Sequence, residues 1–187
     1  MSAVAETSRD EQFINALEGL IKKDDRAALA ALRRGLGKQP GAAMEMHRYV
    51  VPHLYGVCDE KPYYIVAALI GLYPIASWSS STNKQDNNLG ASLSFLKKES
   101  GDSLERRFVA LLNAHIDDLP DHLRQAISLL KSKEKPVNWL QLLKDIKRWD
   151  SEDNWVQRKW AKGFWGQDQN NDENNAAATE AATTENQ

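Results

Sequence analysis

Apolar residues that recur every three or four positions constrain the fold of this 187-residue chain more than any other feature. Two stretches show the same spacing: Leu104, Phe108, Leu111, Leu112 and His115, then Leu119, Leu123, Ala126, Ile127 and Leu130. This spacing places the side chains on one face of an α-helix, which repeats every 3.6 residues. No stretch alternates apolar and polar residues as a half-buried strand does. The sequence therefore predicts an all-α fold.

Helix starts are marked by polar residues at capping positions. Ser8 and Glu11 have the spacing of a capping box, and Asp24 or Asp25 begins a second helix that runs through Arg34. Further starts are expected at Pro62, Leu89, Asp102, Asn138 and Ser151. A segment over 42–54 is broken by Pro52. The segment from Pro62 to Tyr73 is apolar all round, which predicts a central buried helix.

We expect residues 1–165 to form a compact bundle of about eight or nine helices. The polar segment 77–88 interrupts the helical pattern, so a division into two helical subdomains near residues 77–101 stays open. Residues 166–187 contain five acidic residues, no basic residue and no bulky apolar residue. This composition predicts a disordered acidic tail.

The composition, 42% hydrophobic and 27% charged, is typical of a soluble globular domain. No apolar run reaches the roughly 20 residues that a membrane-spanning helix needs, and the first residues do not have the pattern of a secretory signal. Cys58 is the only cysteine, so no internal disulfide is expected. We therefore expect a cytoplasmic protein without a membrane partner.

Catalytic and metal-binding patterns are absent from the sequence. The four histidines lack the spacing of a helical zinc site: His47, His53, His115 and His122. Asp117 and Asp118 suit the start of a helix, and Cys58 has no basic neighbour that would activate it. We expect no catalytic residue, metal or cofactor. A hydrolase site assembled from His47, His115 and Asp117 is the rival hypothesis.

The basic residues give a positive indication. The net charge is −2, but residues 121–165 hold ten basic and six acidic residues, and the acidic tail hides this excess. Arginine and lysine residues recur beside the predicted apolar faces, as in Arg106-Arg107, Arg124, Lys131 and Arg148. A cationic helical surface suits a polyanion, because phosphate binding releases counterions. Solvated helix faces also carry such residues routinely, so the pattern alone leaves both interpretations open.

Five of the six tryptophans lie between Trp139 and Trp165. Trp139, Trp149, Trp155 and Trp160 fall on predicted apolar faces, so we expect them in the core. Trp165 and Trp78 fall outside regular faces, and a stacking platform for nucleic-acid bases is the alternative interpretation for these two.

The ordered set of segments resembles the CasB family, the small subunit of the type I-E CRISPR Cascade complex. The matching segments are 30–35, 62–69, 89–93 and 105–112, followed by Leu123-Arg124-Gln125-Ala126, Trp139, Arg148-Trp149 and Trp160. The resemblance covers about residues 10–166. It implies an all-helical protein without nuclease activity or cofactor. It also implies that two copies lie head to tail in the complex, beside its backbone subunits and its large subunit.

The resemblance further implies contact with guide RNA and target DNA, with both strands of the R-loop held in place. It assigns this role to Arg33, Arg34, Arg106, Arg107 and Arg124, and also to Arg148, Arg158 and the loop residue Lys84. Lys131 is added from the helical pattern. The alternative is a purely protein-binding helical scaffold subunit with no direct nucleic-acid contact.

Overall fold

The computed structural model describes residues 8–77 and 87–166. Within these ranges it has nine α-helices, two short 3₁₀ helices and no strand, which confirms the predicted all-α fold. The elements in chain order are α1 (Arg9–Lys22), α2 (Arg26–Arg33), η1 (Met44–Met46), α3 (His47–Val50), η2 (Val51–His53), α4 (Lys61–Leu72), α5 (Leu89–Ser94), α6 (Lys97–Leu112), α7 (Leu119–Ser132), α8 (Trp139–Ile146) and α9 (Trp155–Trp165).

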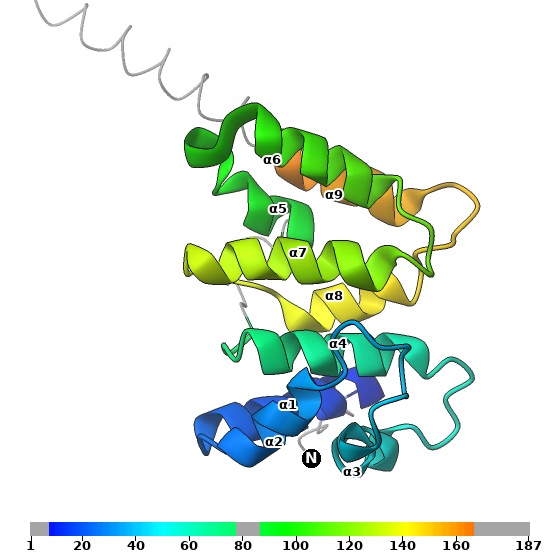
Figure 1. Cartoon of the computed structure of the whole chain (residues 1–187). Coiled ribbons are helices and arrows are strands. Elements are labelled where there is room, and N and C mark those ends of the chain that lie inside the picture. Colours follow the sequence, from blue (N-terminus) through cyan, green and yellow to red (C-terminus); the bar gives the residue numbers. More distant parts are fainter. Residues whose placement is uncertain (1–7, 78–86, 167–187) are drawn as a thin grey trace, which may run out of the picture.

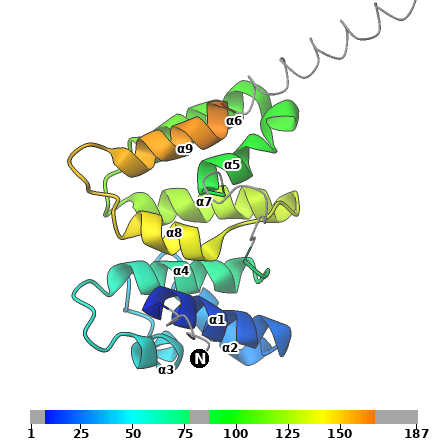
Figure 2. The same cartoon turned by 180° about the vertical axis from the view of Figure 1, so that it is seen from behind.

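The helices are stacked in successive layers (Figure 1). α1, α2 and α3 form one end, α4 lies next to them, and α7 and α8 follow. α5, α6 and α9 form the other end, and the view from behind in Figure 2 shows the same order. α4 contacts α2 on one side and both α7 and α8 on the other. α4 therefore lies between the two ends of the molecule, and α1 also contacts α8 directly.

Burial explains why α4 takes this central place. Its residues from Pro62 to Gly71 are all buried, as the apolar sequence predicted. Gly71 allows α2 to come close, because a Cβ atom there would lie 2.6 Å from the backbone nitrogen of Arg33. The hydrophobic cluster around α4 runs from Phe13 to Phe164. It contains side chains from both sides of the segment at 77–101, and the subdivision into two subdomains stays a prediction.

Three predicted helix caps are confirmed. Ser8 and Glu11 form a reciprocal capping box at the start of α1. Asp25 accepts a hydrogen bond from the backbone nitrogen of Ala28 at the start of α2, and Asn138 caps α8 in the same way. Each cap satisfies a backbone N–H group that has no partner inside its helix.

The predicted helix bounds were correct in part. The segment 42–54 is interrupted near Pro52 as predicted, because proline cannot supply the N–H group that a longer α-helix needs, and it consists of two 3₁₀ turns around the four-residue α3. α6 spans Lys97–Leu112 but has a non-helical backbone at Gly101, with a φ of 47°, so a helical segment begins near Asp102 as predicted and an unpredicted short helical segment precedes it. α9 begins at Trp155 instead of Ser151, since Asn154 takes a left-handed conformation.

The contact between α5 and α9 was not expected from the sequence. Asn88 was predicted in a polar loop, yet it is 2% exposed, caps α5 and donates a hydrogen bond to the carbonyl of Lys159. Gly90 and Gly163 permit this close approach: a Cβ atom at Gly90 would lie 2.0 Å from the carbonyl oxygen of Trp160. α5 therefore ends at Ser94, packed against α9, instead of running on to Gly101.

Some sequence predictions fall beyond the described residues. Lys84, Trp78 and the acidic tail after Gly166 are among them. In the described ranges, no helix combines the length and the apolar character that crossing a membrane requires.

Candidate nucleic-acid interface

Two predicted cationic residues meet at the C-terminal end of α4. Arg33 donates a hydrogen bond from Nε to the carbonyl of Gly71 at 2.9 Å, and Lys131 donates from Nζ to the carbonyl of Leu72 at 2.9 Å. These carbonyls belong to the last turn of α4, where the helix dipole favours positive charge. Both side chains remain exposed. Arg33 and Lys131, which we call the α4-end cations, thus have a structural role in joining α2 and α7 to α4.

Arg34 and Arg124 flank the glycine-rich turn at 35–41. Arg34 forms an exposed ion pair with Glu45 at 3.0 Å, and Arg124 pairs with Asp121 at 3.5 Å, one turn earlier in α7. The guanidinium of Arg124 also lies over Gly37, 3.6 Å from the position that a Cβ atom would take. Both arginines therefore have carboxylate neighbours, which would compete with phosphate for them.

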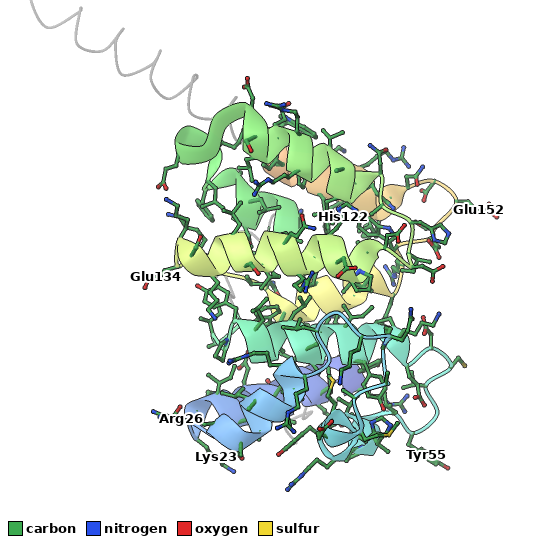
Figure 3. All side chains as sticks on the ribbon, viewed as in Figure 1. Lys23, Arg26, Tyr55, His122, Glu134 and Glu152 are labelled. Atoms are coloured by element: carbon green, nitrogen blue, oxygen red, sulfur yellow. The ribbon has the colours of Figure 1, made fainter. Side chains whose placement is uncertain are left out.

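Arg106 and Arg107 are adjacent and exposed on α6, but they have different surroundings. Arg107 lines a small hollow of about 90 Å³ between α6 and α7, together with His122 and Gln125. Figure 3 labels His122 in this gap. Arg106 makes a long hydrogen bond of 3.4 Å to the carbonyl of Asp102 in its own helix. Among the described residues, neither guanidinium forms an ion pair with a carboxylate within 4.0 Å.

A further group of cations surrounds the turn between α8 and α9. Arg148 follows α8, whereas Arg158 and Lys159 belong to α9. Arg158 pairs with Asp153 at 3.3 Å. Arg148 and Lys159 instead lie against the indole ring of Trp155, at 6.0 and 5.1 Å from its centroid. Lys144 and Lys147 line the same hollow as these two cations. We call Lys144, Lys147, Arg148, Trp155 and Lys159 the Trp155 surface.

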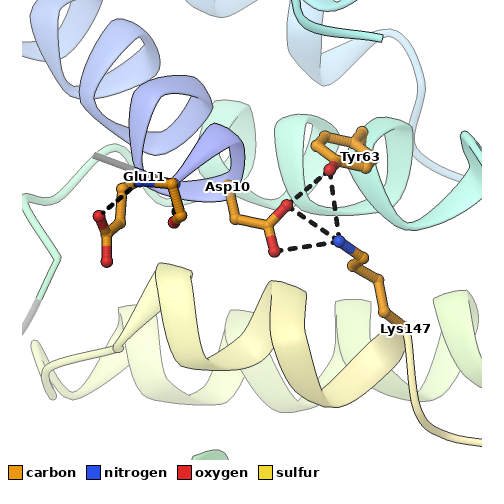
Figure 4. A network of polar contacts seen from close by, with 5 residues as sticks. Asp10, Glu11, Tyr63 and Lys147 are labelled. Carbon is orange, nitrogen blue, oxygen red and sulfur yellow. Dashed lines mark hydrogen bonds and ion pairs between the residues drawn. The ribbon is translucent and has the colours of Figure 1, made fainter. Parts of the chain in front are cut away.

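Lys147 connects this surface to the first helix (Figure 4). Its Nζ lies 3.0 Å from both carboxylate oxygens of Asp10, and the hydroxyl of Tyr63 donates a hydrogen bond to the same carboxylate. Burial alone would raise the pKa of Asp10. The hydrogen bonds from Tyr63 and Lys147 and the charge of Lys147 outweigh that effect and hold this pKa below its usual value. Burial alone would lower the pKa of Lys147. The hydrogen bond to Asp10 and the charge of Asp10 outweigh that effect and hold this pKa above its usual value.

Asp145 is the buried acid beneath the Trp155 surface. Its carboxylate accepts hydrogen bonds from the indole nitrogen of Trp160 and from the amide of Gln141, both at 2.7 Å. Burial raises the pKa of Asp145, while the two hydrogen bonds and the nearby charges of Lys159 and Arg148 oppose the rise. Asp145 therefore fixes α8 to α9 and orients the turn that carries Trp155.

The tryptophan predictions were correct in part. Trp139, Trp149 and Trp160 are buried as expected. Trp155 was expected in the core but is 41% exposed, and it is the first residue of α9. Trp165, an alternative stacking platform, is half-buried against Phe108 and Phe164, and its indole nitrogen donates to Glu105.

The histidines have no common site. His47 packs against the ring of Tyr64, and His53 against Phe13. Burial lowers the pKa of His53. His115 was expected on an apolar helix face, but α6 ends at Leu112 and His115 is exposed beside Asp117 at 3.4 Å. In residues 8–77 and 87–166, no three side chains of His, Cys, Asp or Glu are grouped so that they could hold a metal.

The structure thus brings some predicted residues together and separates others. Arg33 meets Lys131 at the end of α4, whereas Arg148 and Arg158 lie at the turn between α8 and α9. Lys144, Lys147 and exposed Trp155 were not selected from the sequence. Trp155 and Lys159 are four residues apart at the start of a helix, and side chains at this spacing lie on the same helix face. This spacing could have indicated their contact.

The fold and these residues define a small all-helical protein with cations exposed at several of its surfaces. A family model for the CRISPR-associated protein Cse2 matches residues 28–165. The CRISPR-associated protein Cse2 of Thermus thermophilus is 34% identical over 167 residues, which cover 85% of this chain and 91% of that protein. The chain therefore belongs to the Cse2 family, which confirms its resemblance to CasB.

Solved structures agree with this assignment. The crystal structure of M. ruber CasB superimposes with a TM-score of 0.73 at 28% identity, covering 90% of this chain and 98% of that one. A chain of a CRISPR RNA-guided surveillance complex matches with a TM-score of 0.69 at 29% identity, covering 83% and 91%. The similarity thus extends over nearly the whole of each relative.

Proposed function

We propose that this chain is a non-catalytic small subunit of a CRISPR RNA-guided surveillance complex, and that it binds nucleic-acid backbone without sequence preference. The observation that carries the proposal is the match to the Cse2 family over residues 28–165. The similarity to a chain of a surveillance complex supports it. The exposed cations of α6 and of the Trp155 surface supply groups that can bind phosphate.

The proposed role suits the energetics of guided recognition. Exchange of a DNA duplex for an RNA–DNA duplex is nearly balanced in free energy, so contacts to the backbone can shift the equilibrium. Because the guide RNA selects the sequence, the protein needs only to hold target and displaced strands of the R-loop. Binding of this kind depends on counterion release and weakens steeply with salt.

The proposed partners follow from the same family. They are the backbone subunits and the large subunit of the complex, guide RNA and target DNA, and a second copy of this chain arranged head to tail. Complexes of this kind require protein contacts as well as nucleic-acid contacts.

A purely protein-binding scaffold is the second candidate, and one surface favours it. Met44, Val51 and Tyr55 lie close together in sequence around α3 and are exposed, Tyr55 by 91%. Figure 3 labels Tyr55. Exposed apolar and aromatic side chains of this kind are typical of protein interfaces. Under this alternative, the cations would contact acidic neighbours instead of phosphate.

The direct experiment is reconstitution of the complex with and without this chain. We expect the chain to co-purify with the other subunits and guide RNA, and we expect the complex without it to bind target DNA less tightly. A chain that is excluded from the complex would contradict the proposed role. A chain that is incorporated but has no influence on target binding would favour the scaffold.

Charge reversal separates the two candidates further. Arg106→Glu with Arg107→Glu is expected to leave the protein folded and incorporated, yet to weaken R-loop formation. The matched control is Lys22→Glu with Lys23→Glu, another adjacent exposed pair, at the end of α1. If the α6 variant dissociates from the complex instead, these arginines contact protein.

A further inference from the structure

Trp155 differs from the other tryptophans of the described chain. Trp155 is 41% exposed, whereas Trp139, Trp149 and Trp160 are buried and Trp165 is half-buried against two phenylalanine rings. A tryptophan exposed to this degree loses part of the benefit of burial that usually accounts for the residue. Core packing therefore accounts for Trp155 less well than for the other tryptophans.

Two cations lie against the Trp155 ring. Lys159 is one helical turn further along α9, with Nζ at 5.1 Å from the ring centroid, and Arg148 approaches from the end of α8 at 6.0 Å. Within the described residues, neither side chain has a carboxylate within 4.0 Å. Cation–π contacts are weak at exposed sites, so the ring and both charges are available to a ligand.

A hollow of about 330 Å³ lies beside the ring. Four cationic side chains line it, Lys144, Lys147, Arg148 and Lys159, along with two carboxylates. Asp10 is already bound by Lys147 and Tyr63, and Asp145 is buried and bound by Trp160 and Gln141. Both acids are thus engaged, and the accessible charge in the hollow is positive.

A neighbouring hollow at Trp155 has a different character. A second hollow, which Trp155 shares with Lys147 and Arg148, is also lined by Asp150 and Asp153. Asp153 is paired with Arg158, and Asp150 makes this hollow less favourable for an anion. A ligand with negative charges is therefore expected to place them in the hollow lined by Lys144 and Lys159, with its apolar part against the indole.

The start of α9 adds to this attraction. Asn154, which precedes Trp155, has a φ of 49° and makes no side-chain capping bond to the helix. The first backbone N–H groups of α9 thus lack a side-chain cap and form the positive end of the helix dipole. A phosphate near Trp155 would gain from both the dipole and the neighbouring cations.

We propose that the Trp155 surface binds single-stranded nucleic acid, with a base stacked on the indole of Trp155 and the adjoining phosphates held by Arg148, Lys159 and Lys144. An aromatic ring beside cations is the arrangement that binds single strands, since every base has a flat face and every nucleotide a phosphate. A duplex offers its phosphates but keeps its base faces stacked inside. This inference rests on the proposed function and specifies the strand form that this part of the molecule prefers.

The test measures the affinity of the full chain for three fluorescent probes at low salt: a thymidine oligonucleotide, an abasic oligonucleotide of the same length and a DNA duplex. The variants are Trp155→Ala and the conservative Trp155→Phe. The matched control is Tyr55→Ala, which removes another exposed aromatic ring away from the cationic hollow. Circular dichroism checks that each variant is folded.

We expect Trp155→Ala to weaken binding of the thymidine oligonucleotide by roughly 5- to 150-fold, the range of base stacking on an aromatic side chain. Its affinity for the abasic strand and for the duplex should be almost unchanged. Trp155→Phe should retain most of the affinity for the thymidine oligonucleotide, and Tyr55→Ala should behave as wild type with all three probes.

Equal loss with all three probes, or no loss with the thymidine oligonucleotide, would overturn the stacking site. If wild type binds an acidic polypeptide as tightly as the oligonucleotide and Trp155→Ala weakens both alike, the surface is a protein-docking site and the inference fails. If wild type binds none of the nucleic acids, the proposed function itself is in doubt. These outcomes are distinct, so the two proposals can fail separately.

Discussion

The α4-end cations and the Trp155 surface carry the same type of charge in different settings. Arg33 and Lys131 donate to carbonyl oxygens of the last turn of α4, so their side chains are held by the protein itself. Arg148 and Lys159 lie against an exposed aromatic ring and have no such acceptor in the described chain. The first pair stabilises the junction of three helices, whereas the second is available to a ligand.

This difference shows why exposure and charge are insufficient to define a binding site. Arg33, Lys131 and Arg148 are all exposed, and all three were selected from the sequence for the same role. Their neighbours separate them, because a cation that already has an acceptor must give up part of that interaction to bind phosphate. Substitutions of paired and unpaired cations should therefore have different consequences for binding and for stability.

Charge reversal at the Trp155 surface should have the largest effect on binding. Arg148→Glu with Lys159→Glu replaces two available cations by anions, and we expect the affinity for a thymidine oligonucleotide to fall roughly ten- to a hundredfold. The slope of log affinity against log salt should become shallower by about 1.4, since two phosphate contacts on a single strand are lost. Fluorescence anisotropy across a salt series measures both. An unchanged slope would show that these cations do not contact phosphate.

Removal of the α4-end cations should mainly reduce stability. Arg33→Ala with Lys131→Ala deletes two hydrogen bonds to α4. Because both side chains are exposed, water replaces part of each bond, and we expect the free energy of unfolding to fall by about 1 to 2 kcal/mol. For a chain of this size, the melting temperature should fall by about 2 to 8 °C. Thermal unfolding measures this change, with Lys131→Arg as a control that keeps a donor. A melting temperature equal to that of wild type would show that Arg33 and Lys131 do not stabilise the fold.

The Asp10–Lys147 ion pair should give stability that depends on pH. The pKa of Asp10 is lowered in the folded protein, so its contribution is present above the unfolded pKa and is lost as pH falls through the folded pKa. Asp10→Asn is expected to cost about 1 kcal/mol near neutral pH, and this cost should vanish in acid. Urea unfolding at several pH values measures it. A cost that persists unchanged in acid would contradict this account of the pair.

The exposed pair of Arg34 and Glu45 should have the smallest effect. Both side chains are largely in water, where solvent and salt screen their attraction. We expect Arg34→Ala to leave the melting temperature unchanged within error and to lower oligonucleotide affinity less than the variant of Arg148 and Lys159 does. A clear loss of stability would mean that this ion pair helps to position the 35–41 turn.

The sequence predicted much of the fold because its information is local. Apolar periodicity identified most helices, and caps were found at Ser8, at Asp25 of the two candidates Asp24 and Asp25, and at Asn138. The contact of α5 with α9 could not be predicted, since it depends on the joint packing of Gly90 and Gly163, which are far apart in the sequence. The start of α9 was also missed, because a left-handed Asn154 leaves no clear pattern.

The candidate site was harder to predict than the fold. The sequence identified cationic positions, but it could not show that Arg33 and Lys131 meet at one helix end. It placed Trp155 in the core on the basis of periodicity, although this residue is the first of α9 and is 41% exposed. Tertiary structure decides which cations donate to hydrogen-bond acceptors of the protein and which are left to water.

The most direct test of the central claim is R-loop formation by the assembled complex that contains Arg148→Glu with Lys159→Glu. Incorporation of the variant is verified first, and opening of the target duplex is then followed by permanganate reactivity of unpaired thymines. We predict a fully incorporated subunit and weaker R-loop formation than with wild type. Full incorporation with undiminished R-loop formation would contradict the claim that the Trp155 surface holds nucleic acid.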